Sequence, residues 1–126
     1  MSLERKIAGK ARDLVEAQIE KDPKHEKETS YRSLCESLPI LLRTADLAQT
    51  ATFLKAKKDE HDLVYGHLEG QLKELGLLDG KETLINKATD PKLETPQYRL
   101  LFEMTMTVAY WHKRMAQALL RKKDEK

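Results

Sequence analysis

The feature that most constrains the fold of this chain is the spacing of its apolar side chains, which recur every three or four residues along almost its whole length. The longest run lies near the C-terminus. Its apolar positions are Tyr98, Leu101, Met104, Val108, Trp111, Met115 and Leu119. This spacing is the period of one face of an α-helix, and Thr95 followed by Pro96 is typical of a helix N-terminus. The sequence therefore predicts one long C-terminal helix.

The same spacing predicts helices through most of the remaining sequence. The predicted segments are 2–21, a helix that starts at Thr29 or Ser30 and continues to about 54, then 61–75, and a short piece at 83–88. Pro39 stands inside the second segment and removes one helical N–H, so we expect a kink or a split near that residue. Gly76 is expected to end the third segment in a left-handed conformation. The predicted fold is all-α, a single compact bundle of five to six helices.

Length and cysteine content predict a single domain. A chain of this size can bury about 65% of the surface that its unfolded form exposes, and no linker-like stretch divides it, so we expect one helical domain over residues 1–126. No apolar stretch is long enough to span a bilayer, and the charged N-terminus lacks the apolar segment of a signal peptide. The single cysteine, Cys35, cannot form an internal disulfide. These features predict a cytoplasmic protein with no membrane partner.

The overall charge gives no argument for nucleic-acid binding. The chain carries 23 Lys and Arg residues against 21 Asp and Glu residues, a net charge of +2. Any such argument must come from where the cations stand. Two apolar helical segments, 38–57 and 110–120, contain cations or have them close by. Those cations are the candidates for a binding surface.

The residues do not predict a catalytic or metal site. His61-Asp62 resembles the dipeptide of HD phosphohydrolases, but none of the four histidines stands in a His-x-x-His or His-Glu-x-x-His spacing. Cys35 belongs to the apolar face that includes Leu34 and Leu38, so we interpret it as a core residue. The stretch 66–70 lacks the Lys and the Ser or Thr of a phosphate-binding loop. We therefore expect a protein that is not an enzyme and needs no cofactor.

Two stretches carry a family resemblance. The first runs from Leu38-Pro39 through Arg43 to Leu47-Ala48-Gln49-Thr50 and Phe53-Leu54-Lys55, and the second is Trp111-His112-Lys113-Arg114-Met115-Ala116-Gln117-Ala118-Leu119, with Tyr98 upstream. In order and spacing they resemble the small all-helical subunit of the Cmr effector complex of type III-B CRISPR systems. The chain departs from that family's pattern at Asp46, where a glycine is common, and at Thr52, His112 and Met115.

The resemblance implies a structural role in antiviral defence. A subunit of this kind is non-catalytic: its copies stack along one side of a ribonucleoprotein filament, beside the other Cmr subunits, and help to form the channel for the target RNA. The implied partners are those subunits, further copies of the same chain, and single-stranded guide or target RNA within the complex. Among the cations, Arg43, Lys113 and Arg114 fall at positions of the family's motifs.

Six cations are candidates for contact with RNA or with a neighbouring subunit. They are Arg43, Lys55, Lys57, Lys58, Lys113 and Arg114. Cations at helix ends can meet phosphates without reading bases. The lysines at 55, 57 and 58 could instead be a solvated helix end, because cations favour helix C-termini. Arg43 could form a surface ion pair with Asp46, and Lys113 and Arg114 could simply flank Trp111. We expect Trp111 to be a core anchor rather than a base-stacking platform.

Two other non-catalytic functions stay open at this point. One is the analogous small subunit of the type III-A complex, although the Leu-Pro and Trp-x-Lys-Arg elements favour type III-B. The other is a generic helical adaptor or a DNA-binding protein. A helix-turn-helix protein needs an exposed recognition helix after a short turn, and in the stretch 73–87 the following helix is too short.

Overall fold

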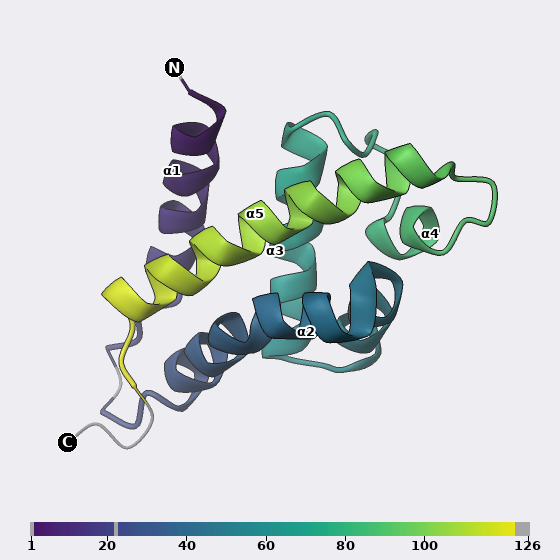
Figure 1. Ribbon diagram of the computed structural model, residues 1–126. Coiled ribbons are helices and arrows are strands. Elements are labelled where there is room, and N and C mark those ends of the chain that lie inside the picture. Colours follow the sequence, from purple (N-terminus) through teal and green to yellow (C-terminus); the bar gives the residue numbers. More distant parts are fainter. Residues whose placement is uncertain (1, 22, 123–126) are drawn as a thin grey trace.

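The structure, a computed structural model, describes residues 2–21 and 23–122 and is built from helices (Figure 1). They are α1 (Leu3–Glu16), α2 (Glu26–Ala56), α3 (Glu60–Glu74), α4 (Leu84–Ala88) and α5 (Thr95–Leu119). No strand occurs in those two ranges. The prediction of an all-α bundle of five to six helices with a long C-terminal helix is confirmed. The domain boundaries, 1–126, stay a prediction, and residues 1, 22 and 123–126 lie outside the described part of the chain.

Local signals explain several of the helix ends. Ser2 caps α1, because its side-chain oxygen accepts a hydrogen bond from the Arg5 N–H at 3.2 Å. After α3, Gly76 has a φ of +78°, the left-handed stop that the sequence predicts. α1 is shorter than predicted and ends at Glu16. Beyond it the chain forms tight turns and Ile19 is half exposed, so no apolar burial holds a further helical turn.

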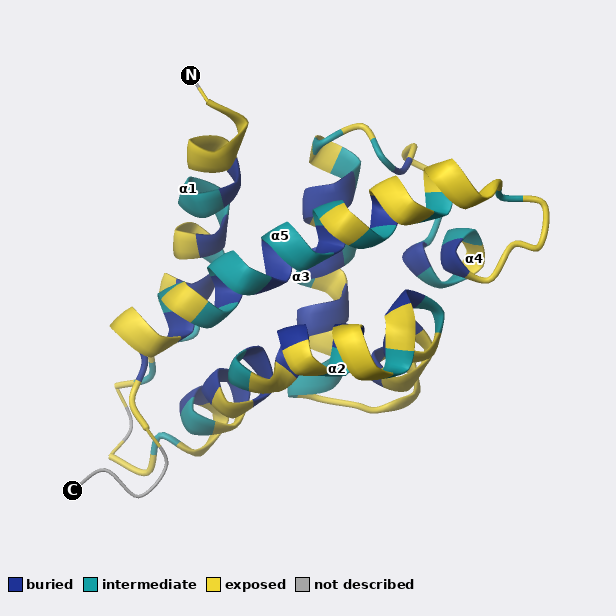
Figure 2. Ribbon diagram, viewed as in Figure 1, coloured by how far each residue is buried: buried dark blue, intermediate teal, exposed yellow. Residues whose placement is uncertain are grey.

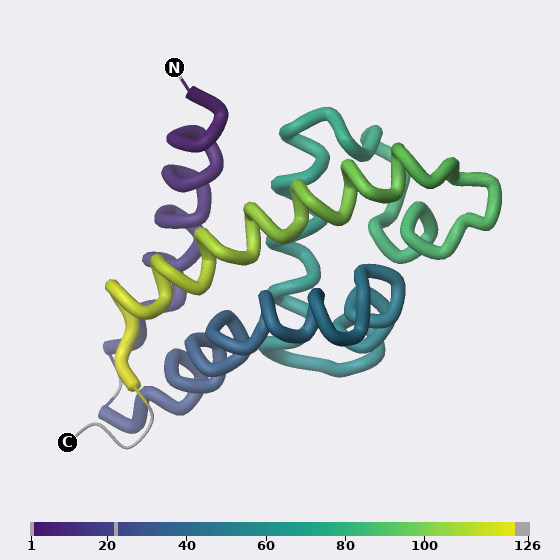
Figure 3. The backbone as a smooth tube through the Cα atoms, in the orientation of Figure 1, coloured from purple at the N-terminus to yellow at the C-terminus, as the bar shows by residue number. Residues whose placement is uncertain are grey.

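α2 and α5 are the two longest helices in the described part of the chain, and they pack against each other. Figures 1 and 3 show α5 running across the whole molecule, with α1 beside its C-terminal half and α4 near its N-terminal end. The first part of α2 runs antiparallel to α5, and contacts also join α5 to α1 and α3. The two cation-bearing segments of the sequence therefore lie on neighbouring helices. None of the helices in the described ranges is both long and apolar enough to cross a bilayer.

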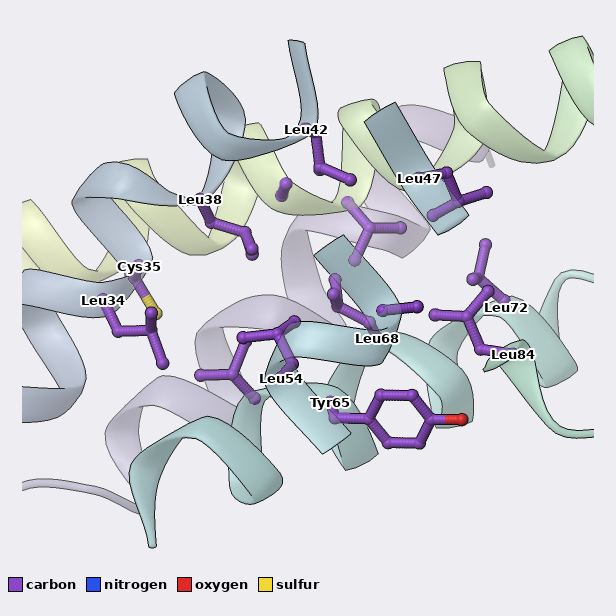
Figure 4. Close-up of a cluster of buried hydrophobic side chains, with 14 of the residues drawn as sticks. Leu34, Cys35, Leu38, Leu42, Leu47, Leu54, Tyr65, Leu68, Leu72 and Leu84 are labelled. Atoms are coloured by element: carbon purple, nitrogen blue, oxygen red, sulfur yellow. The ribbon is translucent and has the colours of Figure 1, made fainter. Parts of the chain in front are cut away.

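An apolar core lies between the helices, and Figure 2 shows the buried residues on their inward faces. Figure 4 shows the centre of this core. Its almost fully buried leucines are Leu38, Leu42, Leu47, Leu54, Leu68, Leu72, Leu84 and Leu101. Burial of each stabilises the fold by roughly 1.5–3 kcal/mol. Because these leucines come from α2, α3, α4 and α5, the core holds those four helices together.

The break in α2 lies at Asp46, and the prediction of a junction near Pro39 is wrong. The chain keeps helical geometry through Pro39, which is itself buried between the fully buried side chains of Leu38 and Leu42. That burial holds the helix together despite the missing N–H. Asp46 has φ 69° and ψ 170°. A non-glycine residue pays about 1–3 kcal/mol for such a conformation.

Hydrogen bonds hold this break in place. The Leu47 N–H donates to Asp46 Oδ1 at 2.7 Å, and the Ala48 N–H donates to the Tyr98 hydroxyl of α5 at 3.2 Å. The Thr50 hydroxyl, which is buried, donates across the break to the Leu41 carbonyl at 3.2 Å. These bonds offset the backbone strain at Asp46.

The buried face of α5 overlaps only in part with the predicted one, which shares Leu101 and Val108 with it. Its buried residues are Leu101, Thr105, Val108, Ala109, His112 and Ala116. The prediction of Trp111 as a core anchor is wrong, because this side chain is only partly buried and packs at the edge of the core. The small side chains of Ala109 and Ala116 let neighbouring helices come close, so the larger apolar side chains lie at the rim.

A polar network lies within the core where α5 meets α2 and α3. The Tyr31 hydroxyl lies 2.9 Å from His67 Nδ1 and 3.4 Å from His112 Nδ1. Gln71 accepts a hydrogen bond from His112 Nε2 and donates one to the Ile7 carbonyl of α1. Burial lowers the pKa of His67 to about 4 and that of His112 to about 3, so both rings are neutral near pH 7. The network therefore links four helices through neutral groups.

Candidate nucleic-acid interface

Arg43 is exposed near the end of the first part of α2, three residues before the break. Its guanidinium lies over the ring of Tyr110 in α5, 5.7 Å from the ring centroid. A cation in this position is attracted by the face of the ring. The alternative of an ion pair with Asp46 is wrong, since no such pair occurs in the described part of the chain and the Asp46 carboxylate accepts from the Leu47 N–H instead.

Arg114 lies one turn after Tyr110 on α5 and is exposed. It lines a hollow of about 270 Å³ between α1 and α5. The lining residues are Glu4, Thr107, Tyr110, Trp111 and Arg114. The indole N–H of Trp111 donates to Glu4 Oε1 at 3.0 Å. This bond fixes α1 against α5 and leaves Arg114 beside two aromatic rings.

The antiparallel packing of α2 and α5 places Lys113 on the same surface. Gln117 of α5 donates to Glu36 of α2 at 3.3 Å, and Tyr110 meets Arg43 about two turns away on both helices. Lys113 stands between those two contacts on α5, and Ile40 stands between them on α2 with 56% of its surface exposed. Arg43, Tyr110, Lys113 and Arg114 therefore form one surface, which we call the α2–α5 basic face.

The other three candidates form a separate group at the end of α2. Lys55 Nζ lies 3.3 Å from Asp62 Oδ1 of α3 and 5.3 Å from the centroid of the Tyr65 ring. Lys57 Nζ lies 5.4 Å from the centroid of the Phe53 ring, and Lys58 is exposed in the connection to α3. The Asp62 carboxylate offsets one of these charges. The six predicted cations therefore lie in two separate groups. The three at positions of the family's motifs, Arg43, Lys113 and Arg114, all belong to the α2–α5 basic face.

Sequence reasoning missed Tyr110, the residue that brings the α2–α5 basic face together. Its ring contacts Arg43 and lines the hollow with Arg114. The available signal was its spacing, because Tyr110 precedes Lys113 by three residues and Arg114 by four, which places all three on one side of a helix. The contact with Arg43 could not be predicted, since it depends on how α2 packs against α5.

The histidines and the cysteine serve other contacts. His61 packs edge-on against Phe53 at 5.4 Å between ring centroids, and its neighbour Asp62 pairs with Lys55. Cys35 is buried, and burial raises the pKa of its thiol to about 12, so the thiol stays protonated. In residues 2–21 and 23–122, no three His, Cys, Asp or Glu side chains are grouped so that they could hold a metal ion.

Comparison with known families gives the identity of this fold. The family model for the CRISPR-associated protein Cas_Cmr5 matches residues 3–119, a range that includes all five helices and all six candidate cations. The chain belongs to the Cmr5 family. The resemblance to the small subunit of the type III-B Cmr complex is confirmed.

One relative and one solved structure of the Cmr5 family show how far the similarity extends. The CRISPR system Cmr subunit Cmr5 of Thermus thermophilus is 34% identical over 97 residues, which cover 77% of this chain and 81% of that protein. The X-ray crystal structure of a CRISPR-associated Cmr5 family protein, also from Thermus thermophilus, matches with a TM-score of 0.77 and 28% identity. That match covers 96% of this chain and 100% of the other.

Proposed function

We propose that this chain is a non-catalytic small subunit of a type III-B Cmr ribonucleoprotein complex that takes part in antiviral defence in the cytoplasm. Copies of it stack along the filament beside the other Cmr subunits and help to form the target-RNA channel. Its α2–α5 basic face meets the RNA backbone without reading bases. Membership of the Cmr5 family supports the assignment to the complex.

The grouping of Arg43 and Arg114 around Tyr110 is the observation that carries the RNA contact. Both arginines are exposed, and neither is paired with a carboxylate in the described part of the chain. Lys113 adds a third cation on the same side of α5. Three cations without an acidic partner among residues 2–21 and 23–122, on two packed helices, suit a chain of phosphates, because each can release a condensed counterion from the RNA.

The second group of cations, Lys55, Lys57 and Lys58, is a weaker candidate for the same role. Lys55 is paired with Asp62, and α3 begins with the acidic residues Glu60 and Asp62. A phosphate approaching this end of α2 meets carboxylates as well as lysines. We therefore assign contact with a neighbouring subunit to this group and contact with RNA to the α2–α5 basic face.

The test is the salt dependence of target-RNA binding by the assembled complex. Each lost phosphate contact with a single strand should flatten the plot of log affinity against log salt by about 0.7. The double variant Lys113→Glu/Arg114→Glu is expected to weaken binding and to flatten this slope by about 1.4. Circular dichroism of the variant chain confirms folding, and co-purification confirms assembly.

The matched control is Lys81→Glu/Lys92→Glu. It makes the same change of charge at two exposed lysines, one in the α3–α4 connection and one just before α5 begins. These positions lie at the other end of α5 from Lys113, so the control should keep the slope of the unaltered complex. Equal slopes for the unaltered complex and Lys113→Glu/Arg114→Glu would reject the RNA contact.

A further inference from the structure

The hollow between α1 and α5 presents aromatic surface beside the α2–α5 basic face, with which it shares Tyr110 and Arg114. Tyr110 and Trp111 both line it and both are only partly buried. The rest of its lining is short or charged: Thr107, Glu4 and Arg114. Exposed aromatic rings beside cations are the surfaces on which the bases of single-stranded nucleic acids stack.

Hydrogen bonding fixes the orientation of the Trp111 ring. Its N–H already has a partner in Glu4 Oε1 at 3.0 Å, so the edge of the indole needs no further ligand. Arg43 holds the neighbouring ring of Tyr110 from the side of α2. Both rings are therefore positioned before any ligand arrives, which lowers the entropic cost of binding.

The charges around the hollow favour a nucleotide over an acidic protein segment. Among the residues that line the hollow, Arg114 is the one cation and Glu4 the one carboxylate, and Arg43 and Lys113 add positive charge on the side of α5 that faces α2. A peptide carboxylate entering the hollow would meet Glu4 directly. A nucleotide can place its neutral base on the rings and its phosphate on the cations at the rim.

We propose that this hollow is a stacking site for one unpaired base of single-stranded RNA, with Trp111 and Tyr110 supplying the aromatic surface and Arg114 meeting the adjoining phosphate. The proposal rests on the proposed function and adds base stacking to it, a contact whose strength does not depend on salt. Because every base has a π-face, the site accepts any of the four bases.

The test uses the complex assembled with variants of Trp111. Loss of stacking in Trp111→Leu should weaken RNA affinity about tenfold and leave the salt slope unchanged. Trp111→Phe keeps an aromatic face and loses the bond to Glu4, so it should bind within about twofold of the unaltered complex. The salt slope of Lys113→Glu/Arg114→Glu tests the proposed function separately. An unchanged affinity for Trp111→Leu, or a loss accompanied by a flatter slope, overturns the stacking site alone.

A second measurement needs no substitution and decides the proposal even if Trp111→Leu unfolds. The chain contains one tryptophan, so 5-fluorotryptophan in this subunit alone places one fluorine probe in the hollow of each copy in the assembled complex. Target RNA should shift its ¹⁹F resonance, and an acidic polymer without bases, polyphosphate, should not. A resonance that RNA leaves in place, or that RNA and polyphosphate shift equally, overturns the stacking site.

Discussion

The two faces of α5 differ in a way that the sequence alone conceals. The inner face contains small and polar side chains as well as larger apolar ones. Thr105, Ala109, His112 and Ala116 are all buried there. The outer face carries Tyr110, Trp111, Lys113 and Arg114, which include the helix's largest rings. Size therefore does not decide which residues enter this core. Close packing of α1, α2 and α3 against α5 leaves room for small side chains inside and turns two aromatic rings toward the surface.

We expect this difference to separate the residues of α5 that stabilise the fold from those that bind RNA. The inner face contacts the other helices through apolar packing and the Tyr31–His67–His112–Gln71 network. On the outer side, Trp111 donates to Glu4 of α1, Tyr110 contacts the Arg43 guanidinium of α2, and Gln117 donates to Glu36 of α2. Substitutions on the inner face should therefore change the free energy of unfolding, and those on the outer face should change RNA binding.

The largest expected effect comes from two neighbouring leucines of α5. Leu101 is 2% exposed and Leu100 is 51% exposed. Leu101→Ala should lower the free energy of unfolding by about 2–5 kcal/mol, because it removes buried methyl groups and leaves a cavity. Leu100→Ala should change it by no more than about 0.5 kcal/mol. Urea unfolding followed by circular dichroism measures both. Similar losses for the two variants would mean that the assignment of the inner face is wrong.

The next effect is a pH dependence of stability that arises from the inner face. The pKa of His67 falls to about 4 and that of His112 to about 3 on folding, mainly through burial. The unfolded chain therefore binds more protons than the folded chain below the ordinary histidine pKa of about 6.5. Stability should be fully present above that pH and should fall as the pH drops toward 4, by at most about 1.4 kcal/mol per pH unit for each histidine.

A variant identifies which residue causes this dependence. His112→Gln removes one of the two groups that take up a proton on unfolding, so the slope of stability between about pH 6 and pH 5 should fall by about half. Urea unfolding at several pH values measures the slope. A slope that is the same with and without His112 would contradict the buried, neutral state of this ring.

A smaller effect is expected at Asp46, where α2 is broken. Asp46→Gly relieves the positive φ of 69° but loses the bond to the Leu47 N–H, so stability should rise by about 1 kcal/mol or less. Asp46→Ala loses the same bond and keeps the strain, so stability should fall by about 1 kcal/mol. Thermal unfolding of the pair measures the difference. A more stable alanine variant would show that the break is not strained.

The fold could be predicted where local signals act alone. The three- and four-residue spacing located the helices, and Thr95-Pro96 and Gly76 located two of their ends. The break at Asp46 could not be predicted, because an aspartate disfavours this backbone conformation. Two hydrogen bonds stabilise it, one to the Tyr98 hydroxyl of α5 and one from Thr50 across the break to Leu41. The prediction of a junction at Pro39 fails because it considers only the missing N–H. Burial of the neighbouring residues Leu38 and Leu42 keeps α2 helical there.

The candidate site could be predicted in part. The motif cations Arg43, Lys113 and Arg114 were named from the sequence, and packing of α2 against α5 brings Arg43 to the side of α5 that carries the other two. The acidic partner of Lys55 was not foreseen, because Asp62 belongs to the next helix. Trp111 was placed in the core because a single large ring on an apolar stripe is usually buried. In the structure the small residues Ala109 and Ala116 occupy the inner face of α5, and Trp111 is only partly buried.

The most direct test of the outer face is a photo-crosslink from within it. Thr107 lines the hollow with Tyr110 and Arg114, whereas Lys92 lies just before the opposite end of α5. A benzophenone amino acid replaces Thr107 in one preparation of the complex and Lys92 in another, and each is irradiated with labelled target RNA. If RNA contacts the outer face of α5, we expect a covalent RNA adduct from position 107 and none from position 92. An adduct from position 92 alone, or equal yields from the two positions, would contradict it.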